Sequence, residues 1–379
     1  MNTPKIRFKG FTDDWEQRKL GELCNITTGK LDANAMVSDG QYDFYTSGID
    51  VFKIDVAAFE GPAITIAGNG ASVGYMHLAD GKFNAYQRTY VLTDFLADRQ
   101  FLNVAIGNEL PNKIQEEVRG SGIPYIVLNM LTDLAIPFPS HEEQYAIGVY
   151  FQQLDHLITL HQRKCDETKQ LKKFMLQKMF PKNGEKNPEI RFKGFTDDWE
   201  QRKVGEVTKE LLDYDNFSSG LPLLTSSRSG LMYQSEYRGN ATTENENTLF
   251  SVVPLNACTY RHMSDDSTFH LNINTLEKGL VSKEYPVFQE NESNLKFIVQ
   301  YINSSNSFTK FCTEQKKGGT RTRLYYKTLC EYKLMMPSIK EQNKTANFFD
   351  TLDHLITLHQ RKCEKLKELK KFMLQNMFV

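Results

Sequence analysis

The twelve residues Leu154–Cys165, LDHLITLHQRKC, return letter for letter at Leu352–Cys363, which is 198 positions later. The shorter run KKFMLQ at Lys172–Gln177 returns at Lys370–Gln375 with the same offset. A repeat of this kind indicates that one structural unit is present twice, and it constrains the architecture more than any other feature of the chain.

Each copy is predicted to be one long amphipathic helix. The segments that follow Pro139 and Pro337 contain no further proline before Phe180 and Val379, and Gly148 is the one glycine in them. Such a segment of about 40 residues would be ~60 Å long if it were helical throughout. Each begins with the pattern S-x-x-E, which predicts a capping box between Ser140 and Glu143 and between Ser338 and Glu341.

The apolar residues of both segments recur at helical spacing, and we interpret them as a seam along which the two helices pack antiparallel. The expected seam residues are Leu154, Leu157, Ile158, Leu171 and Met175 in the first copy and Leu352, Leu355, Ile356, Leu366 and Met373 in the second. Identity of the copies favours a shared seam, because a symmetric contact needs the same residues from both sides. The alternative is that each helix packs on its own neighbouring domain.

A second repeat precedes each half of the chain. The fourteen residues Ile6–Lys19, IRFKGFTDDWEQRK, return at Ile190–Lys203 with an offset of 184. We interpret this segment as a structural strap, with Phe8, Phe11 and Trp15 as packing anchors. The run PKNGEKNPE between Phe180 and Ile190 has the composition of a helix stop and linker.

Between the repeats lie two inserts that do not resemble each other. Both alternate short apolar runs with turn residues, and helices are expected at 101–118 and 295–311, so the fold class is predicted as α+β: two globular domains and two long antiparallel helices in a pseudo-twofold repeat. The expected segments are 1–139 (strap and first recognition domain), 140–180 (first helix), 181–206 (linker and strap), 207–337 (second recognition domain) and 338–379 (second helix).

Composition and missing motifs argue against several classes of protein. The chain has 379 residues, 40% hydrophobic and 25% charged, without an apolar run long enough for a membrane span. Its six scattered cysteines indicate a reducing, cytoplasmic setting, and neither they nor the histidines have metal-ligand spacing. We find no P-loop, no methyltransferase motif for a flipped base and no nuclease constellation, which argues against a fused enzyme.

Contact with nucleic acid would have to come from local patches, because the net charge is −1. Glycine-rich turns and polar clusters are the candidates, since they bring backbone amides and side-chain donors to phosphates and base edges. In the first insert these are Gly68, Asn69, Gly70, Ser72, Gln87, Arg88 and Ser121. In the second they are Ser226, Ser227, Arg228, Arg261, His262, Lys316, Lys317, Thr320, Arg321 and Arg323. Ordinary solvated turns are the competing interpretation at each position.

The order of strap, insert, helix, strap, insert and helix resembles the specificity subunits of type I restriction–modification enzymes. The resemblance rests on the F-x-G-F…W…G-E starts at Phe8–Glu22 and Phe192–Glu206, on the P-S-x-x-E-Q helix starts at Pro139 and Pro337, and on the repeated helix itself. It covers essentially the whole chain; the inserts alone are not specific.

The resemblance implies a non-catalytic protein that binds double-stranded DNA. Each insert would read one half of a bipartite, non-palindromic site, and the paired helices would set the spacer between the halves. Helices and straps would dock two methyltransferase subunits, and restriction/translocase subunits would join them. S-adenosylmethionine, ATP and Mg²⁺ would belong to those partners, so no cofactor is expected here. The acidic first insert, with 7 Lys+Arg against 13 Asp+Glu in residues 23–139, leaves a non-DNA interaction scaffold as the alternative.

Overall fold

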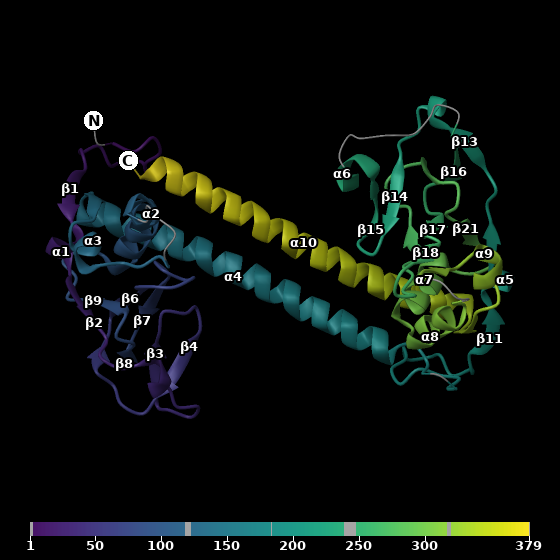
Figure 1. The fold of residues 1–379 in the computed structure, drawn as a ribbon, viewed down its shortest axis with the longest axis horizontal. Coiled ribbons are helices and arrows are strands. Elements are labelled where there is room, and N and C mark those ends of the chain that lie inside the picture. The colour runs from purple at the N-terminus through teal and green to yellow at the C-terminus, as the bar shows by residue number, and fades with distance from the viewer. Residues whose placement is uncertain (1–2, 118–122, 183, 239–247, 317–319, 379) are drawn as a thin grey trace. The chain divides into compact units, whose positions relative to one another are not determined.

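The computed structural model describes residues 3–117, 123–182, 184–238, 248–316 and 320–378. The chain forms two compact units (Figure 1): unit 1 comprises residues 1–163 and 359–379, and unit 2 comprises residues 164–358. Each unit therefore joins one insert with part of each long helix, whereas the sequence suggested five consecutive segments.

The two repeated segments are helical throughout, as predicted. Helix α4 covers His141–Lys178 and α10 covers Ile339–Met377. Gly148 lies within α4 and does not interrupt it. A Cβ there would lie 2.9 Å from the backbone nitrogen of Phe101, so the glycine permits close packing.

Each unit holds an antiparallel pair of helix segments. In unit 1 the Lys370 ammonium of α10 lies 2.5 Å from the Asp155 carboxylate of α4. In unit 2 the equivalent pair, Lys172 and Asp353, is also 2.5 Å apart. Both pairs follow the 198-residue offset, so the two segments make the same contact twice.

The predicted seam is partly wrong. Leu154 and Leu352 are buried, and Ile158, Met175, Leu355, Ile356, Leu366 and Met373 are partly buried. Leu157 and Leu171, however, are 40% and 46% exposed. At ~100° per residue, Leu171 lies about 120° around the helix from the buried Cys165, so its side chain points away from the packed face.

The capping-box prediction holds only in part. The Ser140 hydroxyl accepts a bond from the Glu143 backbone nitrogen at 3.4 Å, but the Glu143 carboxylate does not turn back to the cap. It is fully buried and accepts from Arg7 Nε at 2.7 Å and from Trp15 Nε1 at 3.1 Å, which ties the strap to the helix. Glu341 binds Arg191 Nε at 2.7 Å in the same way in unit 2.

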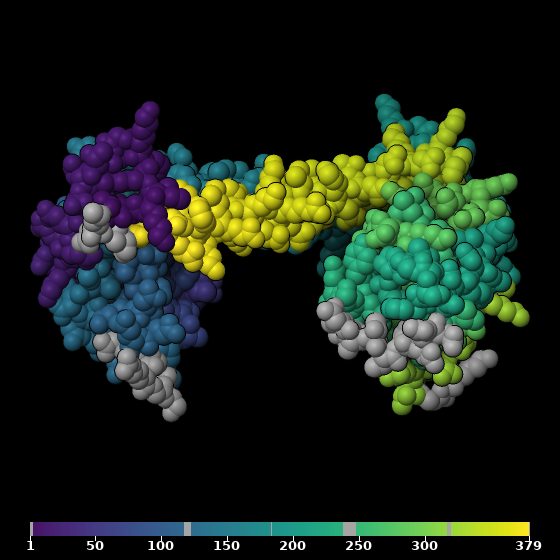
Figure 2. Space-filling view, turned by 90° about the horizontal axis from the view of Figure 1, so that it is seen from above, coloured from purple at the N-terminus to yellow at the C-terminus, as the bar shows by residue number. Residues whose placement is uncertain are grey.

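Both straps pair with the strand that precedes a long helix. In unit 1, β1 (Glu16–Lys19) is antiparallel to β10 (Ala135–Phe138). In unit 2, β11 (Glu200–Lys203) is antiparallel to β23 (Lys333–Met336) in the same register. The Ile6 amide also donates to the Asn376 carbonyl at 2.9 Å, so the strap of unit 1 lies against the end of α10 (Figure 2).

The phenylalanine at the end of each repeated helix, Phe180 or Phe378, packs into the aromatic core of one unit. In unit 1, Phe378 packs against Trp15, Phe101 and Phe151. Phe180 packs against Phe297 and Phe349 in unit 2, and Phe297 also contacts Trp199. Phe8 contacts Tyr150 edge to face. The strap thus acts as the structural element that the sequence indicated.

Unit 1 contains two four-stranded sheets. The first has the order β2 (Asn25–Thr28), β9 (Thr89–Thr93), β6 (Ala63–Ala67), β7 (Met76–Ala79), and the second β4 (Val51–Ile54), β3 (Tyr42–Tyr45), β8 (Lys82–Ala85), β5 (Phe59–Glu60). Unit 1 also contains the 19-residue helix α2 (Arg99–Glu117) and three short helical elements, which are α1 (Leu20–Leu23), η1 (Ala33–Ala35) and α3 (Leu128–Thr132).

Unit 2 repeats the first sheet. Its order is β12 (Thr208–Glu210), β21 (Val287–Glu290), β17 (Cys258–Thr259), β19 (Asn272–Ile273). Its other strands are β13 (Tyr214–Asn216), β16 (Leu249–Val253) and β20 (Gly279–Ser282); β14 (Leu224–Ser227) and β15 (Gly230–Tyr233); and β18 (Met263–Ser264) and β22 (Thr322–Arg323).

Apart from its parts of α4 and α10, the helices described in unit 2 are short. They are α5 (Val204–Val207), η2 (Phe217–Ser219), α6 (Gln234–Arg238), α7 (Leu295–Ser304), α8 (Asn306–Glu314) and α9 (Tyr326–Leu329). The single helix expected at 295–311 is interrupted at Ser305. Ser305 is the N-cap of α8, and its hydroxyl accepts a hydrogen bond from the Phe308 amide. The helix expected at 101–118 is present as α2.

Candidate nucleic-acid interface

Two loops occupy equivalent positions in the first sheet of each unit. In unit 1 the loop after β6 meets the segment before α3, where the Ile126 amide donates to the Gly68 carbonyl at 2.7 Å. In unit 2 the loop after β17 meets the equivalent segment, where the Leu324 amide donates to the His262 carbonyl at 2.8 Å. Ile126 and Leu324 are 198 positions apart, so two dissimilar inserts bring different residues to one topological site.

In unit 1 the glycines of this loop are structural. A Cβ on Gly68 would lie 2.3 Å from the Arg88 carbonyl oxygen, so only glycine allows the two backbones to approach. Gly70 has a φ of +84°, a left-handed conformation that favours glycine. The loop therefore places Asn69 and the partly buried Ser72 beside the chain that carries Gln87 and Arg88.

Several polar groups of this face have no protein partner. Gln87 and Arg88 are exposed, and the Arg88 side chain makes no hydrogen bond or ion pair within the described ranges. The Asn69 side-chain oxygen is buried without a partner there. Tyr75 and Tyr125, which are 41% and 59% exposed, border the same loop. Sequence reasoning missed these tyrosines, although Tyr75 directly follows the glycine-rich run.

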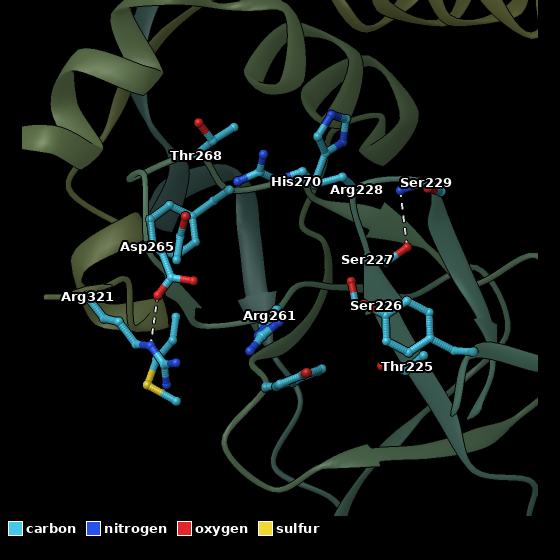
Figure 3. Close-up of a pocket in the computed structure, with 15 residues that line it drawn as sticks. Thr225, Ser226, Ser227, Arg228, Ser229, Arg261, Asp265, Thr268, His270 and Arg321 are labelled. Carbon is cyan, nitrogen blue, oxygen red and sulfur yellow. Dashed lines mark hydrogen bonds and ion pairs between the residues drawn. The ribbon is translucent and has the colours of Figure 1, made fainter. Parts of the chain in front are cut away.

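In unit 2 a hollow with a volume of about 280 Å³ gathers five of the predicted residues (Figure 3). These are Ser226, Ser227, Arg228, Arg261 and Arg321. They come from β14, from the turn after it, from the loop after β17 and from the segment before β22. Residues that are up to 95 positions apart in the sequence, from Ser226 to Arg321, therefore line one hollow.

Two carboxylates that sequence reasoning missed also line or border this hollow. Arg321 Nε donates to Asp265 Oδ1 at 2.8 Å, and Arg228 Nη2 donates to Asp266 Oδ1 at 2.5 Å. Hydrogen bonds from the Ser264 hydroxyl, Arg228 and the Thr268 amide hold the pKa of the Asp266 carboxyl well below its usual range. The sequence signal that could have indicated these carboxylates is the pair Asp265-Asp266, which follows Arg261 closely in the chain.

Some predicted contact residues do not fit direct contact with a ligand. His262 and Ser226 are buried, 4% and 3% exposed. His262 is stacked on Tyr325, and Ser226 Oγ accepts from Asn272 Nδ2 at 2.8 Å, so both serve the interior. Lys316, Thr320 and Arg323 are exposed but do not line the hollow. Ser121 and Lys317 lie outside the described residues.

No metal site emerges from the described part of the chain, where no three His, Cys, Asp or Glu side chains are grouped as metal ligands. His161 and His359 come together in unit 1, with their Nδ1 atoms 3.0 Å apart. Within the same ranges, no helix combines the length and the apolar character that crossing a membrane requires.

Comparison with known proteins adds a family to this geometry. Residues 12–170 and 234–368 match the family model described as the type I restriction modification DNA specificity domain. The specificity subunit of the type I restriction enzyme EcoDI from Escherichia coli is 39% identical over 180 residues, which are 47% of this chain and 40% of that protein. The MjaVIII specificity subunit from Methanocaldococcus jannaschii is 23% identical over 213 residues, 52% of this chain and 49% of its own.

These alignments span less than half of each curated relative. One solved structure is similar over the whole chain: the type I restriction–modification S subunit from M. genitalium has a TM-score of 0.69 with 16% identity, covering 100% of this chain and 99% of that one. At this identity the likeness concerns the fold.

Proposed function

We propose, on the premise that the chain belongs to the family of type I restriction–modification DNA specificity domains, that it is the subunit that reads DNA for a type I restriction–modification complex. Unit 1 reads one half of a bipartite, non-palindromic site and unit 2 reads the other. The chain itself is non-catalytic, and S-adenosylmethionine, ATP and Mg²⁺ belong to its partner subunits.

One observation carries this proposal. The two inserts differ in sequence, yet both build a sheet of the same strand order and bring polar side chains to the same loop position. In unit 1 this position has a glycine-rich loop with Arg88 on the neighbouring segment, and in unit 2 it has a hollow lined by three arginines. Two sheets of the same strand order that carry different polar residues suit two different DNA half-sites better than one ligand bound twice.

The repeated helices support a further part of the proposal. Their identical residues recur in both units and offer equal surfaces, which suits two copies of one methyltransferase subunit. Restriction/translocase subunits then complete the complex. Six unpaired cysteines fit action in the reducing cytoplasm.

Mapping of methylated adenines tests the function. The chain is co-expressed with the methyltransferase subunit of its own system, and host DNA is read by long-read sequencing. We expect a two-part methylated motif with a fixed unread gap. Absence of new methylation from a complex that has been shown to assemble would contradict the proposal. Binding of a non-DNA ligand without steep salt dependence would then favour the interaction scaffold.

A matched insertion tests the proposed role of the helices in setting the gap. Four residues are added after Lys164 in α4 and after Lys362 in α10, which are equivalent positions, so that the antiparallel pairs on either side stay in register. The helices lengthen by ~6 Å, and we expect the gap to grow by about two base pairs at ~3.4 Å each. An unchanged gap with both half-sites still read would contradict this role.

A further inference from the structure

The ion pair between Arg321 and Asp265 leaves part of the guanidinium free. The bond to Asp265 Oδ1 uses Arg321 Nε, at 2.8 Å. Neither terminal nitrogen of Arg321 makes a hydrogen bond within the described ranges. Both side chains are open to solvent, 55% exposed for Arg321 and 79% for Asp265. The carboxylate therefore binds the arginine through Nε and leaves its two terminal nitrogens without a protein partner in the described ranges.

Charge separates two possible roles for such an arginine. Binding to the phosphate backbone depends on positive charge that displaces counterions. The Arg321–Asp265 pair has no net charge, and its carboxylate repels phosphate, so the pair is poorly suited to that role. Arg261 lines the same hollow without an ion pair or hydrogen bond in the described part of the chain, and it is the better phosphate contact.

The hydrogen-bonding groups of the pair match one base pair. In the major groove guanine presents two acceptors, O6 and N7, and its cytosine presents an amino donor. The two terminal nitrogens of Arg321 supply donors for the guanine, and the outer oxygen of Asp265 supplies an acceptor for the cytosine amino group. An adenine–thymine pair offers an amino donor where guanine has O6, so it fits the arginine fork poorly.

From this geometry we infer that unit 2 reads a guanine–cytosine pair of its half-site with Arg321, and that Asp265 positions the arginine and contacts the cytosine. The inference rests on the proposed function and adds to it the identity of one recognised base pair and the residues that read it. Arg321 is the main specificity-determining residue, and Asp265 both positions it and makes the second base contact.

The test uses the assembled complex with the methyltransferase subunit and the motif found by methylation mapping. Competition binding is measured on duplexes in which each base pair of the motif is changed in turn. A second set carries 7-deazaguanine, which lacks the N7 acceptor, at each guanine. Wild type, Arg321→Lys, Arg321→Ala and Asp265→Asn are compared, and thermal unfolding confirms that each variant is folded.

We expect replacement of one guanine–cytosine pair in one half-site to weaken wild-type binding by roughly 5- to 150-fold, the discrimination typical of a good bidentate contact. 7-Deazaguanine at that position should also weaken it. In Arg321→Lys, which keeps the charge but loses the fork, both penalties should fall to about 2-fold or less. Asp265→Asn should reduce discrimination while making the salt dependence steeper, because the pair gains a net positive charge.

Lys53→Arg is the matched control, because Lys53 Nζ also donates to an exposed aspartate, Asp43 at 2.8 Å, but in the second sheet of unit 1. It should leave every base requirement as in the wild type. Unchanged base requirements in the Arg321 variants, or equal losses at both half-sites, would overturn this inference while the proposed function stands. A wild-type complex that assembles but recognises no motif would overturn the proposed function and this inference with it.

Discussion

The candidate faces of unit 1 and unit 2 lie on two sheets of the same strand order, but they differ in how their arginines are paired. Unit 1 presents Arg88, which has no carboxylate partner among the residues that the structure describes, next to Gln87 and exposed tyrosines. In the described part of unit 2, Arg228 and Arg321 are each paired with an aspartate, and Arg261 is not. The difference teaches that one frame can carry two arrangements of arginine charge, one without a carboxylate partner in the described ranges and one largely balanced by aspartates.

The two units also differ in how they hold their straps, and this leads to the largest expected effect. Glu143 binds both Arg7 and Trp15, whereas in unit 2 the Trp199 Nε1 is buried without a partner in the described ranges. Replacing Glu143 by alanine leaves the largely buried Arg7 without a hydrogen-bond partner in the described ranges, a loss that typically costs ~3–5 kcal/mol. Replacing Glu341 costs less, because Arg191 keeps its bonds to Asn187 Oδ1 and to the Asp197 carbonyl. Glu143→Ala should cost about 1 kcal/mol more than Glu341→Ala, since it also leaves Trp15 unsatisfied.

Hydrogen exchange resolved by peptide checks this prediction. Glu143→Ala should lower protection in β1 and β10, and Glu341→Ala in β11 and β23. The isosteric variant Glu143→Gln keeps one of the two acceptor oxygens in place and serves as the control with a smaller loss. Equal losses from the two alanine variants would show that the Trp15 bond adds nothing to unit 1.

Arg88→Ala tests the free charge of unit 1. Because Arg88 has no carboxylate partner in the described ranges, its removal should weaken DNA binding by roughly 5-fold, or about 1 kcal/mol, and lower the salt slope by about one phosphate contact. Binding is measured from 50 to 200 mM salt. Arg88→Lys should retain the slope. A slope unchanged in Arg88→Ala, with lost base discrimination instead, would mean that Arg88 reads a base as Arg321 is proposed to do.

Acidification should affect the two units to different extents. Burial lowers the pKa of His262 and His270 in unit 2 and of His77 in unit 1. A histidine that resists protonation when folded takes up a proton on unfolding, so folding stability is lost as the pH falls through the ordinary histidine pKa of ~6.5.

Unit 2, with two such histidines, should therefore lose more protection than unit 1 between about pH 7 and pH 5, around the ordinary histidine pKa. Hydrogen exchange at matched intrinsic rates measures the difference. His262→Phe, which preserves the stacking on Tyr325, should reduce the loss in unit 2. An equal response of both units would contradict the prediction.

The smallest effect is expected where the units are alike. Asp155→Asn and Asp353→Asn each remove one of the repeated helix ion pairs, whose side chains are 21–49% exposed. Partly exposed pairs contribute ~0–1 kcal/mol, so the two variants should lower the unfolding free energy by the same small amount. Urea denaturation gives the values. Clearly unequal values would show that the helix environments are not equivalent.

Much of the frame was accessible from the sequence. The copied segments predicted two straps and two long helices, and the repeated contacts Asp155–Lys370 and Asp353–Lys172 follow from the same local sequence folding twice. The β-rich inserts and the helix α2 were also predicted. Turn residues, apolar periodicity and repeats are local signals, and local signals carry this information.

The candidate sites were accessible only as scattered pieces. Clusters such as Ser226–Arg228 and Arg321 drew attention by composition, but nothing local indicates that Asp265 faces Arg321 across 56 positions. The same limit made His262 and Ser226 look available although the fold buries them. Side-chain partners and burial depend on contacts between distant segments, which composition and spacing do not encode.

By itself, then, the sequence determined that this protein has two equal frames and two different inserts, because near-identical segments of the same chain adopt the same local structure. Only the tertiary structure decided what those frames do with their residues. In the folded chain Glu143 binds Arg7 of the strap and does not cap its helix. The end of α10 belongs to unit 1. Two arginines of unit 2 form ion pairs with aspartates. Each of these outcomes is a pairing between distant residues, settled by packing and charge balance in the folded chain.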